Sequence, residues 1–183
     1  SHQALNASKR REIKNAAQTG IGFANRCLEV APEEAACYYY RALNTGIYYQ
    51  AHVLGYQKGV KQMIKDCHRS IALDAKLANG GAYRLLGELY TKLPQSTIHP
   101  DGISRDLNKG YSYFQKALRA DINYPENLLG IAENLLAQGS IKDAVDALSQ
   151  AKQLVHKWKL DESYEDWQNT TKDLENKIAK IKN

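Results

Sequence analysis

The chain has 183 residues, of which 43% are hydrophobic and 25% charged, which is enough for one substantial core in a single domain. No run approaches the roughly 18 apolar residues of a membrane-spanning helix, and the first residues, SHQALNASKRRE, do not form a signal-peptide pattern. The formal net charge is +5, but basic and aromatic residues lie in different segments, so nucleic acid is not an expected partner.

Helical spacing of apolar residues dominates the chain, and strand signals are scarce. Eight helices are expected, over residues 6–31, 33–49, 55–74, 80–92, 106–121, 125–138, 140–156 and 164–182. Residues 1–5 are expected to be a flexible N-terminus. Pro32 and Pro125 are each followed by acidic residues, a pattern typical of the first turn of a helix. The sequence therefore predicts an all-α fold.

Two features mark the second half of the chain. Residues 91–106, TKLPQSTIHPDGISRD, are expected to be an insertion loop, because two prolines and a glycine stop the helix. Residues 164–182 place Trp167 and Leu174 on one apolar stripe, which predicts an amphipathic capping helix. Residues 1–183 are therefore expected to form one domain with an internal loop and a closing helix.

The chain repeats a pattern of large and small residues. At an offset of 45, Tyr83, Leu86, Gly87 and Tyr90 match Leu128, Ile131, Ala132 and Leu135. The following helices share a second spacing, found at Gly110, Phe114, Ala117 and Leu118, at Met63, Cys67, Ser70 and Ile71, and at Gly20, Ala24, Cys27 and Leu28. The repeating unit is a helix-turn-helix of about 34 residues. Gly87, which costs roughly 1 kcal/mol within a helix, is predicted to be the position where the second helix approaches closely.

These motifs resemble tetratricopeptide repeats, whose pattern is an aromatic residue, Leu-Gly and Tyr in the first helix, then Ala, an aromatic residue and Ala in the second. The resemblance implies a solenoid of helical hairpins, about three and a half repeats long, with a C-terminal capping helix. The first repeat lacks its own first helix, and the third carries the insertion at 91–106. A solenoid of this kind binds a protein or peptide, without catalysis, in the concave groove lined by the first helices.

The order of motifs over residues 30–182 is similar to that of bacterial repeat proteins related to the T-component lipoproteins of tripartite ATP-independent periplasmic (TRAP) transporters. The shared order is a Gly-Gly-x-Tyr-Arg segment, a Leu-Pro insertion, a Phe-Gln-Lys-Ala-Leu helix and an acidic closing helix with tryptophan. This resemblance implies a periplasmic or exported protein, tethered through a removed N-terminal lipid anchor. Its ligand would be a substrate-binding protein or a hydrophobic small molecule. A cytoplasmic location and a homo-oligomer stay open.

Helix register predicts which side chains line the groove. The predicted partner-binding residues are Tyr39, Leu43, Arg84, Glu88, Glu126, Leu129 and Glu133, with Ile47, Thr91 and Leu136 beside them. For the apolar members, packing against a neighbouring helix is the alternative. Arg84 is expected to pair with a carboxylate of the partner, or with Glu88 in its own helix. An acidic C-terminal peptide is disfavoured, because Glu88 and Glu133 replace the asparagines of chaperone-binding tetratricopeptide domains.

No motif of an enzyme, a phosphate-binding loop or a metalloprotease is present, so neither catalysis nor a metal or other cofactor is expected. Gly80 and Gly81 follow no strand and are expected to allow a tight entry into the next helix. An enzyme using His99 and Asp101 in the insertion loop is the alternative.

The remaining expectations concern the cysteines and the consecutive tyrosines. Cys27, Cys37 and Cys67 lie in apolar helical patterns and are expected to be small buried side chains, with a Cys27–Cys37 bridge as the alternative. Tyrosines 38–40 are consecutive, and neighbours on a helix point about 100° apart. At least one of them is therefore expected to face the groove or an oligomer interface.

Overall fold

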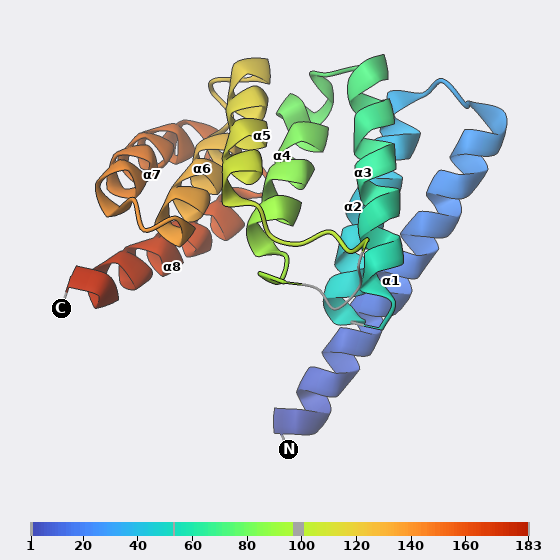
Figure 1. The fold of residues 1–183 in the computed structure, drawn as a ribbon, viewed down its shortest axis with the longest axis horizontal. Helices are drawn as coiled ribbons and strands as arrows, with labels where there is room; N and C mark the ends of the chain where they lie inside the picture. Colours follow the sequence, from blue (N-terminus) through green and yellow to red (C-terminus); the bar gives the residue numbers. More distant parts are fainter. Residues whose placement is uncertain (1, 53, 97–100, 183) are drawn as a thin grey trace. The chain divides into compact units, whose positions relative to one another are not determined.

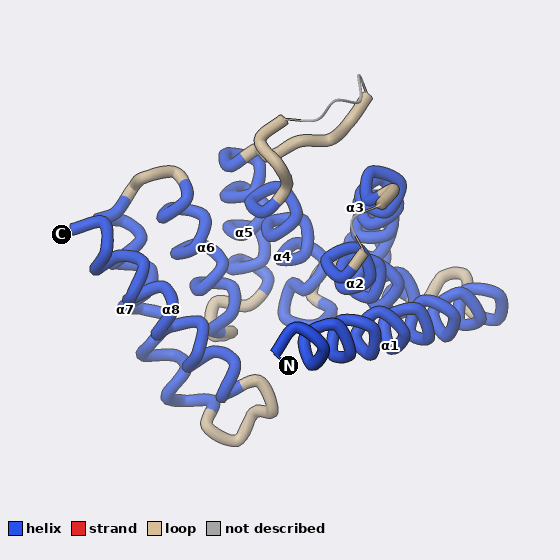
Figure 2. Tube along the Cα trace, turned by 90° about the horizontal axis from the view of Figure 1, so that it is seen from below, coloured by secondary structure: helices blue, strands red, loops and turns tan. Residues whose placement is uncertain are grey.

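The computed structural model describes residues 2–52, 54–96 and 101–182, which are helical along most of their length (Figure 1). These residues contain no strand (Figure 2), which confirms the prediction of an all-α fold of helical hairpins. The chain was expected to form one domain, but it divides into two compact units. The N-terminal unit comprises Ser1–Leu85 and Thr97–Ile103, and the C-terminal unit comprises Leu86–Ser96 and Ser104–Asn183.

The helices follow the predicted order. They are α1 (His2–Val30), α2 (Ala35–Ala51), α3 (Tyr56–Leu73), α4 (Leu77–Lys92), α5 (Leu107–Ala120), α6 (Pro125–Ala137), α7 (Ile141–Val155), the short 3-10 helix η1 (His156–Trp158) and α8 (Tyr164–Lys182). The predicted boundaries differ most at the start of α1, which includes residues 2–5. None of the helices in the described ranges combines the length and apolarity needed to cross a membrane.

In the N-terminal unit, α1 packs against α2 and α2 against α3. A disulfide joins Cys27 near the end of α1 to Cys37 in α2, with the two Cα atoms 5.7 Å apart. The alternative prediction, a Cys27–Cys37 bridge, is therefore correct. The expectation that these two cysteines are small buried side chains without a bridge is wrong. Cys67 is a free, buried thiol, as predicted; burial, aided by the charge of Asp66, raises its pKa.

The start of α4 contains a turn that the sequence marked only by its glycines. Ala78, Asn79 and Gly80 have positive φ angles of 49°, 57° and 80°, in the left-handed region that L-residues rarely adopt. Gly81 follows, and a Cβ atom there would lie 2.7 Å from the ring of Tyr39. The pair of glycines thus gives the tight entry that was predicted.

The connection between α4 and α5 returns to the N-terminal unit. The side-chain amide of Gln57 in α3 donates to the carbonyl of Ile103 at 3.0 Å and accepts from its N–H at 2.9 Å. This reciprocal pair of hydrogen bonds ties Ile103 of the connection to α3. His99, the centre of the enzymatic alternative, lies outside the described residues, and Asp101 is exposed.

The core of the C-terminal unit is built around Phe114 of α5, which is completely buried. Its ring lies between two glycines, Gly87 of α4 and Gly130 of α6. A Cβ atom on Gly87 would come within 2.8 Å of the ring, closer than a methyl group can pack. The prediction that Gly87 is the point of close helix approach is confirmed.

The helix α8 closes the C-terminal unit by packing against α6 and α7. Trp167 of α8 meets Tyr124 and Trp158 edge-to-face, with ring centroids 5.3 and 6.2 Å apart. The indole N–H of Trp158 donates to the carbonyl of Asn123 at 3.0 Å. These contacts confirm the predicted capping helix and anchor its first turns.

Candidate partner-binding cleft

A cleft of about 270 Å³ opens in the C-terminal unit, between the end of α4, one face of α6 and the start of α8. It is lined by Glu88, Lys92, Glu126, Leu129, Gly130, Glu133, Ser163, Asp166, Trp167 and Thr170. Four of the seven predicted partner-binding residues, Glu88, Glu126, Leu129 and Glu133, are among them. Helix register therefore selected residues of α4 and α6 that the structure brings to one cleft.

The cleft is strongly acidic. Four carboxylates line it, against the single ammonium group of Lys92. That ammonium lies 3.3 Å from Glu133 and 3.7 Å from Glu88. Burial opposes the charge of Lys92, but the two carboxylates outweigh it and raise its pKa, so the residue is a cation at neutral pH. The lining thus keeps an excess of three negative charges.

The lining of the cleft also includes two buried apolar side chains. Leu129 and Trp167 each leave only 3% of their surface exposed, and both belong to the core cluster of the C-terminal unit. A ligand entering the cleft therefore meets charged side chains beside two buried apolar ones.

Two buried asparagines hold the helix that carries this wall. Asn127 donates to the carbonyls of Ala117 and Asp121 at the end of α5, at 3.1 and 2.9 Å. Asn134 donates to Thr91 Oγ1 at 2.7 Å. Because buried polar groups need such partners, these bonds fix α6 to the end of α5 and to Thr91 of α4 and so position the glutamates of α6.

The predicted groove residues of the N-terminal unit do not line the cleft. Tyr39 is buried against Gly81, which is the packing alternative, and Leu43 is half-buried. Arg84 is only 5% exposed. Its guanidinium donates to the carbonyls of Ala78 and Asn79 at 3.4 Å. The arginine therefore supports the left-handed turn of α4, and its pairing with a carboxylate of a partner stays a prediction.

Sequence reasoning missed the wall contributed by α8. Asp166 and Thr170 lie on the first turns of the helix that we predicted only as a cap, and Ser163 directly precedes that helix. Asp166 was explained by its place in the first turn of a helix, where an acidic side chain is favourable. Its position beside α6 was therefore not predicted. Lys92, the last residue of α4, falls in both the predicted helix 80–92 and the predicted insertion 91–106, and it was not named among the groove residues.

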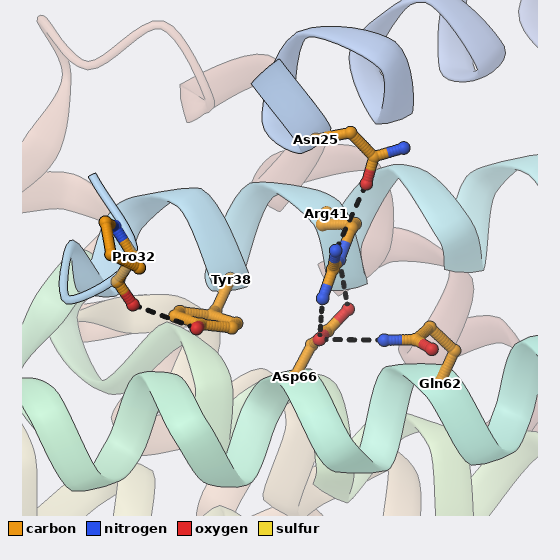
Figure 3. Close-up of polar contacts among 6 residues, drawn as sticks. All are labelled: Asn25, Pro32, Tyr38, Arg41, Gln62 and Asp66. Carbon is orange, nitrogen blue, oxygen red and sulfur yellow. Dashed lines mark hydrogen bonds and ion pairs between the residues drawn. The ribbon is translucent and has the colours of Figure 1, made fainter. Parts of the chain in front are cut away.

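A buried ion pair in the N-terminal unit was likewise missed (Figure 3). Asp66 of α3 accepts two hydrogen bonds from Arg41 of α2, at 2.8 and 2.6 Å, and one from Gln62 at 2.9 Å. Arg41 also donates to Asn25 of α1 at 3.1 Å. The carboxylate of Asp66 is completely buried, and the network ties the three helices together. The sequence signal that could have revealed this ion pair is Asp66 itself, a charged residue next to Cys67 on the apolar face of α3.

The three consecutive tyrosines have different surroundings, as helix geometry requires. Tyr39 is buried, the hydroxyl of Tyr38 donates to the carbonyl of Pro32 at 2.9 Å (Figure 3), and Tyr40 is 52% exposed. The exposed member is therefore Tyr40, not the Tyr39 that register placed in the groove.

Two comparisons with known proteins found no match. The sequence matches no protein-family model and no curated protein. In the part of the chain that is described, no group of three or more histidine, cysteine or acidic side chains is arranged to hold a metal ion. The resemblances to tetratricopeptide repeats and to TRAP T-components stay predictions from sequence motifs, and the acidic cleft is the feature from which a function can be argued.

Proposed function

We propose that this protein is a non-catalytic binding scaffold that holds a basic segment of a partner protein in the cleft between α4, α6 and α8. The observation that carries the proposal is the lining of that cleft, four carboxylates and one ammonium group around the buried Leu129 and Trp167. The charged side chains select a cation, and the two apolar ones accommodate the alkyl stem of a lysine or arginine side chain.

The size of the cleft supports a protein partner over a small molecule. At about 270 Å³ it is below the roughly 300–1,000 Å³ of pockets that enclose drug-sized ligands. It has room for one or two side chains, with the rest of the partner on the surrounding surface. Its charged walls also suit a hydrophobic small molecule poorly, because an apolar ligand would strip water from the carboxylates without replacing their hydrogen bonds.

The charge of the cleft also selects among macromolecules. An acidic peptide or a nucleic-acid phosphate would meet an excess of three negative charges and be repelled. This agrees with the sequence-based argument against an acidic C-terminal peptide. A complementary basic segment would associate faster at low ionic strength and lose affinity as salt is added.

The test is calorimetric titration of the protein with two decapeptides, one alternating lysine with leucine and a matched one with glutamate in place of lysine. We expect only the basic peptide to bind. Replacing Glu126→Gln and Asp166→Asn together should raise its Kd by about tenfold or more, because both carboxylates line the cleft.

The matched control is Glu165→Gln, which removes an exposed carboxylate next to Asp166 that is not part of the cleft lining. Its Kd should stay close to that of the wild type. Equal binding of the two peptides, or equal losses in the control and the double variant, would contradict the proposal.

One observation favours the exported, T-component-like role as a second candidate. The Cys27–Cys37 disulfide is typical of proteins that fold in an oxidising compartment such as the periplasm. Thiol labelling of the unfolded protein, taken from its native cells without reductant, should then modify one cysteine in three. Labelling of all three would count against export.

A further inference from the structure

The cation that lies in the acidic cleft comes from the chain itself. Lys92 is the last residue of α4 and one of the residues that line the cleft. Its Nζ lies 3.3 Å from Oε2 of Glu133 in α6 and 3.7 Å from Oε2 of Glu88 in α4. All three residues belong to the C-terminal unit. The ammonium group of Lys92 therefore occupies a position that a partner's lysine would take.

The ion pairs of Lys92 are loose. Both distances exceed the roughly 2.7–2.9 Å of a well-formed hydrogen bond between an ammonium group and a carboxylate. The side chain of Lys92 is 48% exposed and those of the two glutamates 31% each. By contrast, the Arg41–Asp66 pair closes to 2.6 Å on a carboxylate with no exposed surface. Since exposed ion pairs contribute little stability and the lysine stem is flexible, Lys92 can leave the carboxylates at small cost.

A partner cation competes with Lys92 for these carboxylates. The cleft has a volume of only about 270 Å³, and two ammonium groups inside it would repel each other at short range. A partner's lysine that reaches Glu133 must therefore displace the ammonium group of Lys92 into water. Because only the conformation with Lys92 displaced accepts the partner, the apparent Kd is higher than the intrinsic Kd of that conformation.

We propose that Lys92 is an internal competitor, which occupies the carboxylates of Glu88 and Glu133 until a basic partner segment displaces it. This inference rests on the proposed function, because it describes how the same cleft is filled when no partner is bound. A purely structural ion pair predicts the opposite effect of removing Lys92: the two glutamates would repel each other, the cleft would change shape and the partner would bind more weakly. The two roles therefore differ in the sign of the change in affinity.

Calorimetric titration with the lysine-leucine decapeptide measures that sign. Lys92→Met removes the charge but keeps an unbranched apolar stem, and it should lower the Kd by about threefold to tenfold. The matched control is Lys152→Met. Lys152 pairs with Glu175 outside the cleft and has 47% of its side chain exposed, and its loss changes the net charge equally. The Kd of the control should stay close to that of the wild type, with circular dichroism checking that both variants fold. A Kd that does not fall in Lys92→Met, or that falls equally in both variants, would overturn the proposal.

Nuclear magnetic resonance detects the displacement itself, in protein with isotopically labelled lysine and with an unlabelled decapeptide. The Cε–Hε signal of Lys92 is identified by its absence from the spectrum of Lys92→Met. As the peptide binds, we expect this signal to move toward those of the exposed lysines, while the signal of Lys152 stays in place. A peptide that binds without moving the Lys92 signal would overturn the displacement and leave the proposed function standing. A peptide that binds neither the wild type nor Lys92→Met would overturn the proposed function, and this inference with it.

Discussion

The two units of the molecule are stabilised by different interactions. The N-terminal unit contains all three cysteines of the chain, and its helices are joined by the Cys27–Cys37 disulfide and the buried Arg41–Asp66 ion pair. The C-terminal unit depends on an apolar cluster around Phe114 and Trp167. The acidic cleft lies on this second unit, so we expect it to keep its shape under reducing conditions that weaken the first.

Spectroscopy can follow the two units separately. Both tryptophans of the chain, Trp158 and Trp167, lie in the C-terminal unit, so tryptophan fluorescence reports on that unit. Far-ultraviolet circular dichroism reports on the helices of both. Each change below is expected to move one of these signals more than the other, in order of decreasing effect.

Replacing Phe114→Ala should lower the unfolding free energy of the C-terminal unit by about 3–5 kcal/mol. The ring is completely buried between two glycines, which have no side chains to fill the cavity. Urea denaturation followed by tryptophan fluorescence measures the effect. Tyr40→Ala, at an exposed tyrosine, is the control and should change little; a similar loss in both variants would refute this assignment of the core.

Replacing Arg41→Ala should destabilise the N-terminal unit toward the lower end of the roughly 3–5 kcal/mol expected for a broken buried ion pair. The loss leaves the buried carboxylate of Asp66 without its bidentate partner. Asp66→Ala should cost less, because Arg41 retains 20% side-chain exposure and can turn toward water. Chemical denaturation followed by circular dichroism compares the two, and a larger loss in Asp66→Ala would contradict this reasoning.

Reducing the Cys27–Cys37 disulfide should lower the stability of the N-terminal unit by about 2–3 kcal/mol, as expected for a short loop. The pair is 10 residues apart. Denaturation with and without dithiothreitol should shift the circular dichroism transition while tryptophan fluorescence moves little. Equal shifts of both signals would show that the two units unfold as one.

Two glycine substitutions give the smallest expected effects, with opposite signs. Gly87→Ala gains about 1 kcal/mol of helix propensity, but its methyl group presses on Phe114, which costs roughly 1–3 kcal/mol. Gly22→Ala in α1 gains the same propensity with no atom within 4 Å of the new Cβ. Melting temperatures should fall slightly for the first variant and rise for the second; an increase in both would remove the evidence for a tight contact at Gly87.

Helix order was predictable because amphipathic spacing, prolines and helix-starting acids are local signals. The packing at Gly87 followed from the repeat, since a glycine that weakens its own helix needs a compensating contact. The left-handed turn was not predicted because it includes Ala78, which is not intrinsically suited to that conformation, whereas asparagine and glycine adopt it more readily. Its support comes from Arg84, whose burial depends on the tertiary structure.

The cleft was half predictable for a related reason. Glu126, Leu129 and Glu133 share one helix face, and register alone places them together. Asp166 and Thr170 lie on a helix more than thirty residues away in sequence, and only the packing of α8 against α6 brings them to the same site. Long-range packing of this kind leaves no short-range pattern in a single sequence.

The central claim is that the acidic cleft binds a basic partner segment, and amide chemical shifts measured by nuclear magnetic resonance test it most directly. Labelled protein would be titrated with the lysine-leucine decapeptide. Shifts concentrated at residues 126–133 and 163–170, and at the indole N–H of Trp167, would agree with the claim. Shifts concentrated in the N-terminal unit, or none at peptide concentrations that show binding by calorimetry, would contradict it.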